Sequence, residues 1–292
     1  MTQVLVLGAT GFIGSAVARE LTAHGHHVTA LSRSVMSDEK LEPLGVEPIR
    51  GDLRNHENWC AAVRGCDAIV QAAATFSDDM GDVDAGVLSA IEGVLGDRSE
   101  RLRMVYTGGC WLYGATGDDI ADESSPFNPI PSFAWMVRNA RMLLESERFS
   151  TAVIHPAMVY DRDGGVFEDY LEAAKTGRPV EIWGTPDTRW PLVHRDDLAC
   201  AYRLLVETPE AVGHFNASAE TGVRTGEIAS GIARHFGHEC EFEILSVEEV
   251  VDKYGDWGEG PTLDQQMSSN RLPGELNWRP KYESYKESDI FQ

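Results

Sequence analysis

Residues 4–14 read Val4-Leu5-Val6-Leu7-Gly8-Ala9-Thr10-Gly11-Phe12-Ile13-Gly14. The four apolar residues predict a buried β-strand, and three glycines follow it at the spacing GxxGxxG. The first glycine permits a tight turn, the second lets the backbone approach a phosphate group, and the third lets the next helix pack closely on the sheet. A helix-like stretch over residues 15–23 follows, and its N-terminal amides would face those phosphates. The stretch therefore predicts a dinucleotide-binding βαβ unit.

The residues after the second predicted strand, 27–31, indicate which dinucleotide binds. An NAD site has an acidic residue about twenty residues beyond the glycine turn, where it binds a ribose hydroxyl. This chain has Ser32-Arg33-Ser34 there instead. The Arg33 guanidinium can bind the 2′-phosphate of NADP as a two-pronged fork, with a hydroxyl on either side. The alternative is an ordinary solvated arginine. We expect NADP(H) to be the preferred cofactor, with NAD(H) as the alternative.

Composition excludes several classes of protein. The formal net charge of −22 argues against nucleic acid and anionic membranes as partners, because both require a basic surface. No apolar run is long enough to span a membrane, and the N-terminus has no signal-peptide pattern, so we expect a cytoplasmic protein. The five cysteines form no CxxC pair and the nine histidines no HExxH motif. We therefore expect neither a disulfide framework nor a metal site.

The order of predicted elements indicates an α/β fold with a Rossmann-type, doubly wound parallel sheet. Short strand-like runs alternate with helix-like stretches through the first half of the chain. Further strands are expected at 46–49, 68–71, 103–106 and 151–154, and helices near 55–64, 83–96 and 132–147.

Glycine, proline and tryptophan punctuate shorter elements beyond about residue 160. We expect a nucleotide-binding domain over residues 1–159, completed by residues 191–213 with a helix from 196 to 207. Residues 160–190 and 214–292 would form a smaller, substrate-binding C-terminal lobe.

Several further motifs follow the glycine turn along nearly the whole chain. They are Gly51-Asp52-Leu53, Gln71-Ala72-Ala73-Ala74, the segment 106–114, HPAMVY at 155–160, RWPLVHRDD at 189–197 and LNWRP at 276–280. In this combination the chain resembles the short-chain dehydrogenase/reductase superfamily, in its extended NAD(P)-dependent epimerase/dehydratase branch.

The resemblance adds to the set of cofactor-binding residues. The GDL motif would touch the adenine, and the alanines after Gln71 would lie under the cofactor. With the glycine turn and the segment around Arg33, the expected set is Gly8, Thr10, Gly11, Phe12, Ile13, Gly14, Ser32, Arg33, Ser34, Asp52, Leu53, Ala72, Ala73, Ala74, Thr107, Pro156, Ala157 and Met158.

The catalytic residues of the family are missing. Its members move a hydride with a Ser or Thr, a Tyr and a Lys in a YxxxK arrangement, in which the tyrosine is the general acid and base. Here the Ser/Thr position is Gly109, the tyrosine position falls on Phe133 or Ala134, and the lysine position on Val137 or Arg138. No other alignment restores the set, because residues 114–159 contain no tyrosine and residues 41–174 no lysine.

Other residues on the same segments are candidates for the site. Candidate replacements for the missing acid and base are Cys110, Tyr113, Arg138, His155 and Tyr160, and a packing role is the alternative for each. The candidate substrate pocket comprises Gly109, Trp111, Phe133, Trp135 and Arg189. Its tryptophans favour a flat or apolar ligand. Arg189 stands where relatives hold a substrate phosphate, and a surface ion pair is the alternative.

These features favour an atypical member of the superfamily, an oxidoreductase or related lyase or isomerase acting with NADP(H) on a small, fairly apolar carbonyl or hydroxyl compound. One alternative is a nucleotide-sugar epimerase or dehydratase, against which the missing Tyr and Lys count. The other is a redox-silent protein that binds NADP as a sensor or structural ligand. We expect a small-molecule substrate and a monomer or homodimer.

Overall fold

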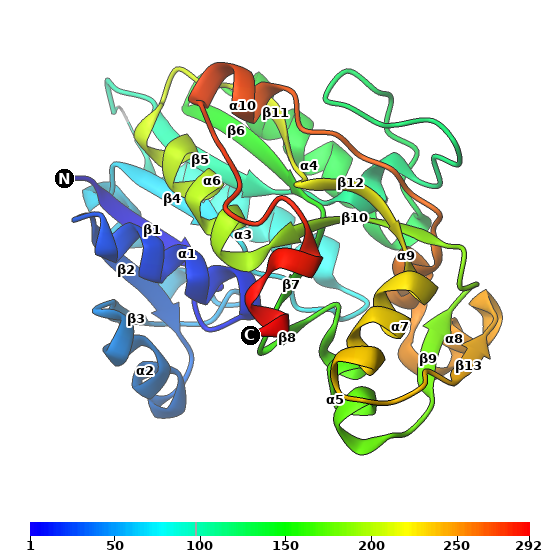
Figure 1. Ribbon diagram of the computed structural model, residues 1–292. Coiled ribbons are helices and arrows are strands. Elements are labelled where there is room, and N and C mark those ends of the chain that lie inside the picture. Colours follow the sequence, from blue (N-terminus) through cyan, green and yellow to red (C-terminus); the bar gives the residue numbers. More distant parts are fainter. Residues whose placement is uncertain (97) are drawn as a thin grey trace. The chain divides into compact units, whose positions relative to one another are not determined.

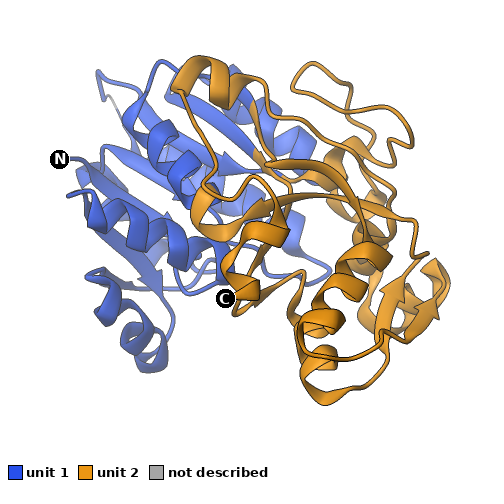
Figure 2. Ribbon diagram, viewed as in Figure 1, with its two compact units in different colours: residues 1–108, 135–154, 198–214 blue, residues 109–134, 155–197, 215–292 orange. Residues whose placement is uncertain are grey.

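The computed structural model describes residues 1–96 and 98–292 (Figure 1). The chain divides into two compact units (Figure 2). Unit 1 comprises residues 1–108, 135–154 and 198–214, and unit 2 comprises residues 109–134, 155–197 and 215–292. The expected nucleotide-binding domain also included residues 109–134, 155–159 and 191–197, which the structure groups with unit 2.

A seven-stranded sheet, counted over the described residues, has the strand order β3-β2-β1-β4-β5-β6-β11. The pairs from β3 to β6 are all parallel, and the order reverses between β1 and β4, as in a doubly wound sheet. The strands are β1 (Gln3–Leu7), β2 (His27–Ser32), β3 (Glu47–Arg50), β4 (Ala68–Gln71), β5 (Leu102–Thr107), β6 (Phe149–Pro156) and β11 (Gly213–Ala217). The predicted fold class is confirmed.

Helices cover both faces of this sheet (Figure 1). On one face lie α1 (Phe12–Ala23) and α6 (Arg195–Glu207), joined by an ion pair of 2.8 Å between Arg203 Nε and Glu20 Oε1. On the other lie α3 (Met80–Val94) and α4 (Ala134–Glu145). The short α2 (Val35–Leu41) follows β2. Leu5, Leu7 and Ile69 of the strands are fully buried beneath these helices, which is the main source of stability for such a layer.

The helix predicted near 55–64 is wrong. The structure has two 3-10 segments instead, His56–Asn58 and Cys60–Gly65. Trp59 separates them with φ −130°. Its buried indole donates a hydrogen bond of 2.9 Å to the carbonyl oxygen of Asp52. The backbone at Trp59 thus lies outside helical geometry, and the buried ring and its hydrogen bond are consistent with that conformation.

Unit 2 has two smaller sheets. One has the order β12-β10-β7-β8, and the other pairs β13 with β9. The strands are β7 (Met158–Asp161), β8 (Gly164–Gly165), β9 (Val180–Trp183), β10 (Arg189–His194), β12 (Glu220–Arg224) and β13 (Phe242–Leu245). The helices are α5 (Glu168–Thr176), α7 (Thr225–His235), α8 (Val247–Tyr254), α9 (Glu259–Thr262) and α10 (Arg271–Leu276).

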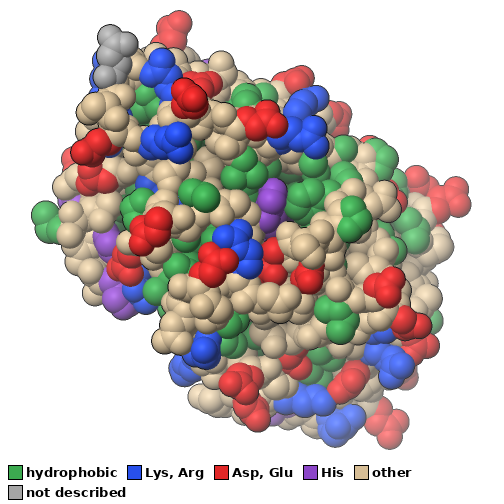
Figure 3. All heavy atoms as spheres, turned by 90° about the horizontal axis from the view of Figure 1, so that it is seen from above, with side chains coloured by type: hydrophobic (Ala, Val, Ile, Leu, Met, Phe, Trp, Pro, Cys, Tyr) green, Lys and Arg blue, Asp and Glu red, His purple; other side chains and the backbone are tan. Residues whose placement is uncertain are grey.

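The surface carries charges of both signs. Figure 3 shows acidic and basic side chains interspersed over the face that it presents. Among the described residues, no helix is long and apolar enough to cross a bilayer.

Candidate cofactor site and active site

The three glycines of the first turn lie in three different environments. Gly8 has φ +90°, and a Cβ there would lie 2.7 Å from the carbonyl oxygen of Ala72. A Cβ on Gly14 would lie 2.1 Å from the carbonyl oxygen of Gly8. Gly11 is exposed, and the corresponding distance from its Cβ to Gly8 O is 3.3 Å. Gly8 and Gly14 are therefore required by the fold. Gly11 has no side chain at the exposed surface of the turn, so a ligand can approach the backbone there.

The start of α1 presents a favourable site for an anion. Gly11 is its N-cap and supplies no side-chain cap, and the first turn contains no acidic residue. Thr10, Phe12 and Ile13 flank this point. Backbone amides at a helix start attract phosphate, because they point outward at the positive end of the helix dipole. The turn therefore fits the pyrophosphate of a dinucleotide.

A buried carboxylate that the sequence analysis missed supports the segment after β4. Asp84 of α3 accepts hydrogen bonds from Gln71 Nε2 (2.7 Å), Tyr106 OH (2.8 Å) and Asn139 Nδ2 (2.7 Å). Gln71 Oε1 in turn accepts the backbone N–H of Ala73 at 3.2 Å. The network thus joins β4, β5, α3 and α4 and orients the alanines predicted to lie under the cofactor. Burial raises the pKa of Asp84.

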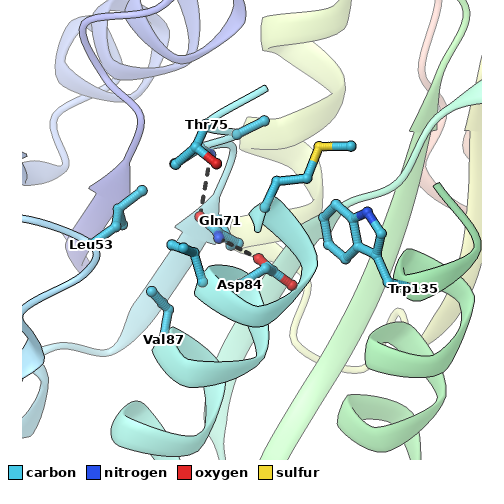
Figure 4. A pocket seen from close by; sticks show the side chains of 10 residues that line it. Leu53, Gln71, Thr75, Asp84, Val87 and Trp135 are labelled. Atoms are coloured by element: carbon cyan, nitrogen blue, oxygen red, sulfur yellow. Dashed lines mark hydrogen bonds between the residues drawn. The ribbon is translucent and has the colours of Figure 1, made fainter. Parts of the chain in front are cut away.

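A small pocket opens beside this network (Figure 4). The predicted cofactor residues Leu53, Ala73 and Ala74 line it together with Trp135, a predicted substrate residue. Gln71 and Asp84 form its polar part, and the other lining residues are Thr75, Met80, Val83 and Val87. The Trp135 ring packs against α3, where a Cβ on Gly81 would lie 2.8 Å from its Cγ. The structure therefore brings Trp135 to the pocket that these cofactor residues line.

The side chains around Arg33 differ in their burial and in their hydrogen bonds. Ser32 is buried and donates a hydrogen bond of 2.5 Å to Asp38 Oδ1. Ser34 caps α2 by accepting the amide of Ser37 at 3.2 Å. Arg33 is exposed. A second arginine, Arg50, also lies at this edge, and sequence reasoning missed it; its position immediately before the GDL motif was the available signal.

Four of the five candidate acids and bases are buried. The exposed fractions are 4% for Cys110, 5% for Tyr113, 0% for His155 and 1% for Tyr160. Burial raises the pKa of Cys110 to about 12 and also raises the pKa values of both tyrosines. Arg138 is exposed on α4. This burial favours packing roles for the four residues over acid–base roles.

Hydrogen bonds hold the turn over Cys110–Tyr113 in place. Tyr113 OH donates to Asn216 Oδ1 at 2.7 Å, and the amide of Gly109 donates to His155 Nδ1 at 3.4 Å. Gln265 Nε2 donates to the carbonyl oxygens of Cys110 (2.9 Å) and Gly114 (2.7 Å). Tyr113 and His155 thus stabilise the conformation of this turn.

Trp111 and Phe133 form an aromatic pair within unit 2, with ring centroids 5.2 Å apart. The other face of the indole meets the backbone at Gly260, where a Cβ would lie 2.5 Å from the ring. Arg189 is paired, since its Nε and Nη2 donate to the two carboxylate oxygens of Asp264 at 2.9 and 2.6 Å and its Nη1 to Asp118 Oδ1 at 3.1 Å.

The remaining predicted cofactor residues are largely enclosed. Thr107 Oγ1 lies 2.6 Å from Tyr202 OH in unit 1. Ala157 and Met158 are buried in unit 2, and the amide of Ala157 donates to Ala217 O at 2.9 Å. Pro156 ends β6. Asp52 accepts the amide of Arg54 at 2.8 Å. Within the described residues, no group of three or more His, Cys, Asp or Glu side chains could hold a metal ion.

Comparison with known proteins defines the family. Residues 4–218 match the model of the NAD dependent epimerase/dehydratase family, and the chain belongs to that family. The resemblance seen in the sequence is therefore confirmed, and with it NAD(P) binding as the family property.

Individual proteins are similar over most of the chain. An uncharacterized protein of Schizosaccharomyces pombe is 28% identical, covering 96% of this chain and 95% of its own. The decarboxylating sterol-4-alpha-carboxylate 3-dehydrogenase of Dictyostelium discoideum is 27% identical, covering 71% and 68%.

Two solved structures share the fold. The dTDP-glucose 4,6-dehydratase DesIV of Streptomyces venezuelae with NAD superposes with a TM-score of 0.82 at 19% identity, covering 99% of this chain and 94% of its own. A human epimerase family protein with NADPH gives 0.78 at 21% identity, covering 97% and 96%.

Proposed function

We propose that this protein is an NADP(H)-dependent oxidoreductase that acts on a small, largely apolar carbonyl or hydroxyl compound. The observation that carries the cofactor choice is Arg33, an exposed guanidinium directly after β2. An acidic residue at this position would select the 2′-hydroxyl of NAD, and a cation favours the 2′-phosphate of NADP. The human structural relative was solved with NADPH, and the Streptomyces relative with NAD.

The chain's own residues would hold the cofactor at three points. The turn at Gly11 and the start of α1 would bind the pyrophosphate, and Arg33 the 2′-phosphate. The alanines after β4, oriented through Gln71 and Asp84, would support the ribose. When bound, NADPH supplies a hydride, and the chain's contribution is to position the acceptor and exclude water.

Two features of unit 2 favour an apolar substrate over a sugar nucleotide. The half-buried Trp111 indole packs on the buried Phe133 ring, so this turn is aromatic in character. Arg189 is already paired with two carboxylates, so its charge is compensated before any substrate phosphate arrives. The Dictyostelium relative is named for a sterol substrate, which is also largely apolar.

A redox-silent NADP-binding protein is the second candidate. The burial of Cys110, Tyr113, His155 and Tyr160 favours it, because a general acid must reach the oxygen that it protonates.

Isotope transfer distinguishes the two candidates. The purified protein is incubated with NADPH deuterated at the transferable position and with aliphatic, aromatic and steroidal ketones. An oxidoreductase transfers deuterium to the carbonyl carbon of a product, and the Gly11→Val variant does not. Tight binding of NADPH without label in any product rejects the oxidoreductase and supports the redox-silent protein.

A further inference from the structure

Arg50 lies at the same sheet edge as Arg33. It is the last residue of β3, and the parallel register of β2 and β3 pairs it with Ser32, the residue before Arg33. Its Nη1 donates to the backbone oxygen and the hydroxyl of Ser32, both at 3.3 Å. Its Nη2 binds Asp38 Oδ2. The guanidinium is thus anchored on β2, beside the residue predicted to select the cofactor.

Asp38 is shared between this arginine and Ser32. Its Oδ1 accepts the Ser32 hydroxyl, and its Oδ2 binds Arg50. The side chain of Arg50 is 52% exposed and that of Asp38 is 28% exposed. Asp38 therefore fixes one side of the guanidinium and leaves about half of the arginine side chain accessible to a ligand.

We propose that Arg50 is the second guanidinium of the 2′-phosphate site and that Asp38 sets the affinity of this site. The inference rests on the proposed NADP preference. A phosphate monoester carries between one and two negative charges, more than Arg33 alone neutralises. Arginine donors form fork-like, charge-assisted bonds to phosphate.

Asp38 has two opposing effects on this site. It orients Arg50 before the nucleotide arrives, and it offsets one of the two positive charges. The affinity for a 2′-phosphate is therefore lower than that of an uncompensated pair of arginines. NAD has no 2′-phosphate, so its binding is independent of this balance.

The test measures binding of two probes by isothermal titration calorimetry to wild type, Arg50→Ala and Asp38→Asn. Adenosine 2′,5′-bisphosphate carries the 2′-phosphate, and AMP lacks it. Arg50→Ala should weaken the binding of the bisphosphate about tenfold or more, and change the affinity for AMP less than about twofold. Asp38→Asn should tighten the bisphosphate about threefold or more, because a like charge is removed while a neutral acceptor remains.

Arg54→Ala is the matched control. Arg54 pairs with Asp79, and their side chains are 47% and 53% exposed. Like Arg50, Arg54 is a cation paired with a carboxylate, but it is not part of the proposed 2′-phosphate site. Its loss should therefore leave the ratio of the Kd values for the bisphosphate and AMP unchanged. If Arg50→Ala unfolds, Arg50→Lys serves instead, since it keeps the charge and loses the fork-like donor geometry. The binding of the bisphosphate should then weaken more than the binding of AMP.

Each remaining result counts against the inference in a defined way. If wild type prefers the bisphosphate but the Arg50 variants weaken both probes equally, the arginine is only structural and the NADP preference stands without it. If Asp38→Asn weakens AMP, Asp38 binds a ribose hydroxyl and the assignment is overturned. If wild type binds both probes equally, the proposed NADP preference itself fails.

Discussion

A Cβ atom on Gly14 would lie 2.1 Å from the carbonyl oxygen of Gly8, a separation that no real side chain adopts. The corresponding distance from Gly11 is 3.3 Å, and Gly11 has ordinary extended dihedrals of φ −85° and ψ 174°. Two glycines of one motif therefore differ in purpose. Gly14 is required for α1 to pack on the turn, and Gly11 leaves space for a ligand.

Gly11→Val should abolish cofactor binding while keeping the fold, because the added side chain occupies the pyrophosphate site. At a hundredfold excess over Kd, NADPH should stabilise wild type by about 2.7 kcal/mol, a thermal shift of a few degrees. The variant should melt cooperatively without that shift. Gly14→Val should fail to fold.

Arg138→Ala is the control for this experiment. Arg138 is exposed on α4, and the phosphate contacts at Gly11 and Arg33 should provide most of the affinity. The variant should retain most of the shift. A wild-type protein that shows no shift with any nicotinamide dinucleotide would falsify the proposed cofactor site.

Arg33→Ala should remove most of the preference for NADPH over NADH. A charge-assisted fork contributes about 1.5–3 kcal/mol, so wild type should bind NADPH roughly ten- to a hundredfold more tightly. Fluorescence titrations of both cofactors into both proteins measure the ratio. Equal affinities in wild type would exclude the 2′-phosphate role.

Sugar nucleotides should not be turned over. The position of the family's tyrosine is predicted to fall on Phe133 or Ala134, and neither side chain accepts a proton. Phe133 is 3% exposed and packs against Trp111. Incubation with UDP-, GDP- and dTDP-sugars should give no epimerised or dehydrated product by chromatography. A product that Gly11→Val abolishes would show that another residue takes the proton.

Asp84→Ala should destabilise unit 1. It would leave Gln71, Tyr106 and Asn139 without the acceptor that pairs them, and buried unpaired donors cost about 1–3 kcal/mol each. A loss of about 2–4 kcal/mol is expected after partial relaxation. Urea unfolding measures it. Asp82→Ala, an exposed change on the same helix, should have little effect.

Asp264→Asn should reduce stability near neutral pH and have less effect in acid. The Arg189 guanidinium holds the pKa of Asp264 below its usual value, so the ionised carboxylate stabilises the folded state above about pH 4. That contribution is lost as the pH falls through the lowered pKa. Solvent screens the partly exposed pair, so a loss of about 1 kcal/mol or less is expected.

Denaturant midpoints at about pH 7 and about pH 3 measure the difference between wild type and Asp264→Asn. Asp118, the fully exposed second partner of Arg189, supplies the control variant Asp118→Asn, which should change little at either pH. An equal loss at both pH values would show that the effect is not due to the charge.

Local sequence predicted the elements whose signals lie within a few residues of one another. Residues 4–14 alone define a strand, a turn and a helix start, because a glycine's freedom and an apolar run act on their immediate neighbours. The same spacing predicts where phosphate binds. It also predicts that the family's Tyr and Lys are missing, since that prediction needs only the residue types at the expected offsets.

Tertiary structure decided which side chains meet. Gln71, Asp84, Tyr106 and Asn139 are separated by up to 68 positions, and only the packing of α3 and α4 against β4 and β5 brings them together. Arg50 reaches Asp38 because β3 pairs with β2, and Cys110 and His155 lose their access to solvent because the turn and strand that carry them pack inward. A hydrogen bond or a buried surface depends on distances set by strand register and helix packing. Those distances cannot be predicted from a local segment of the sequence.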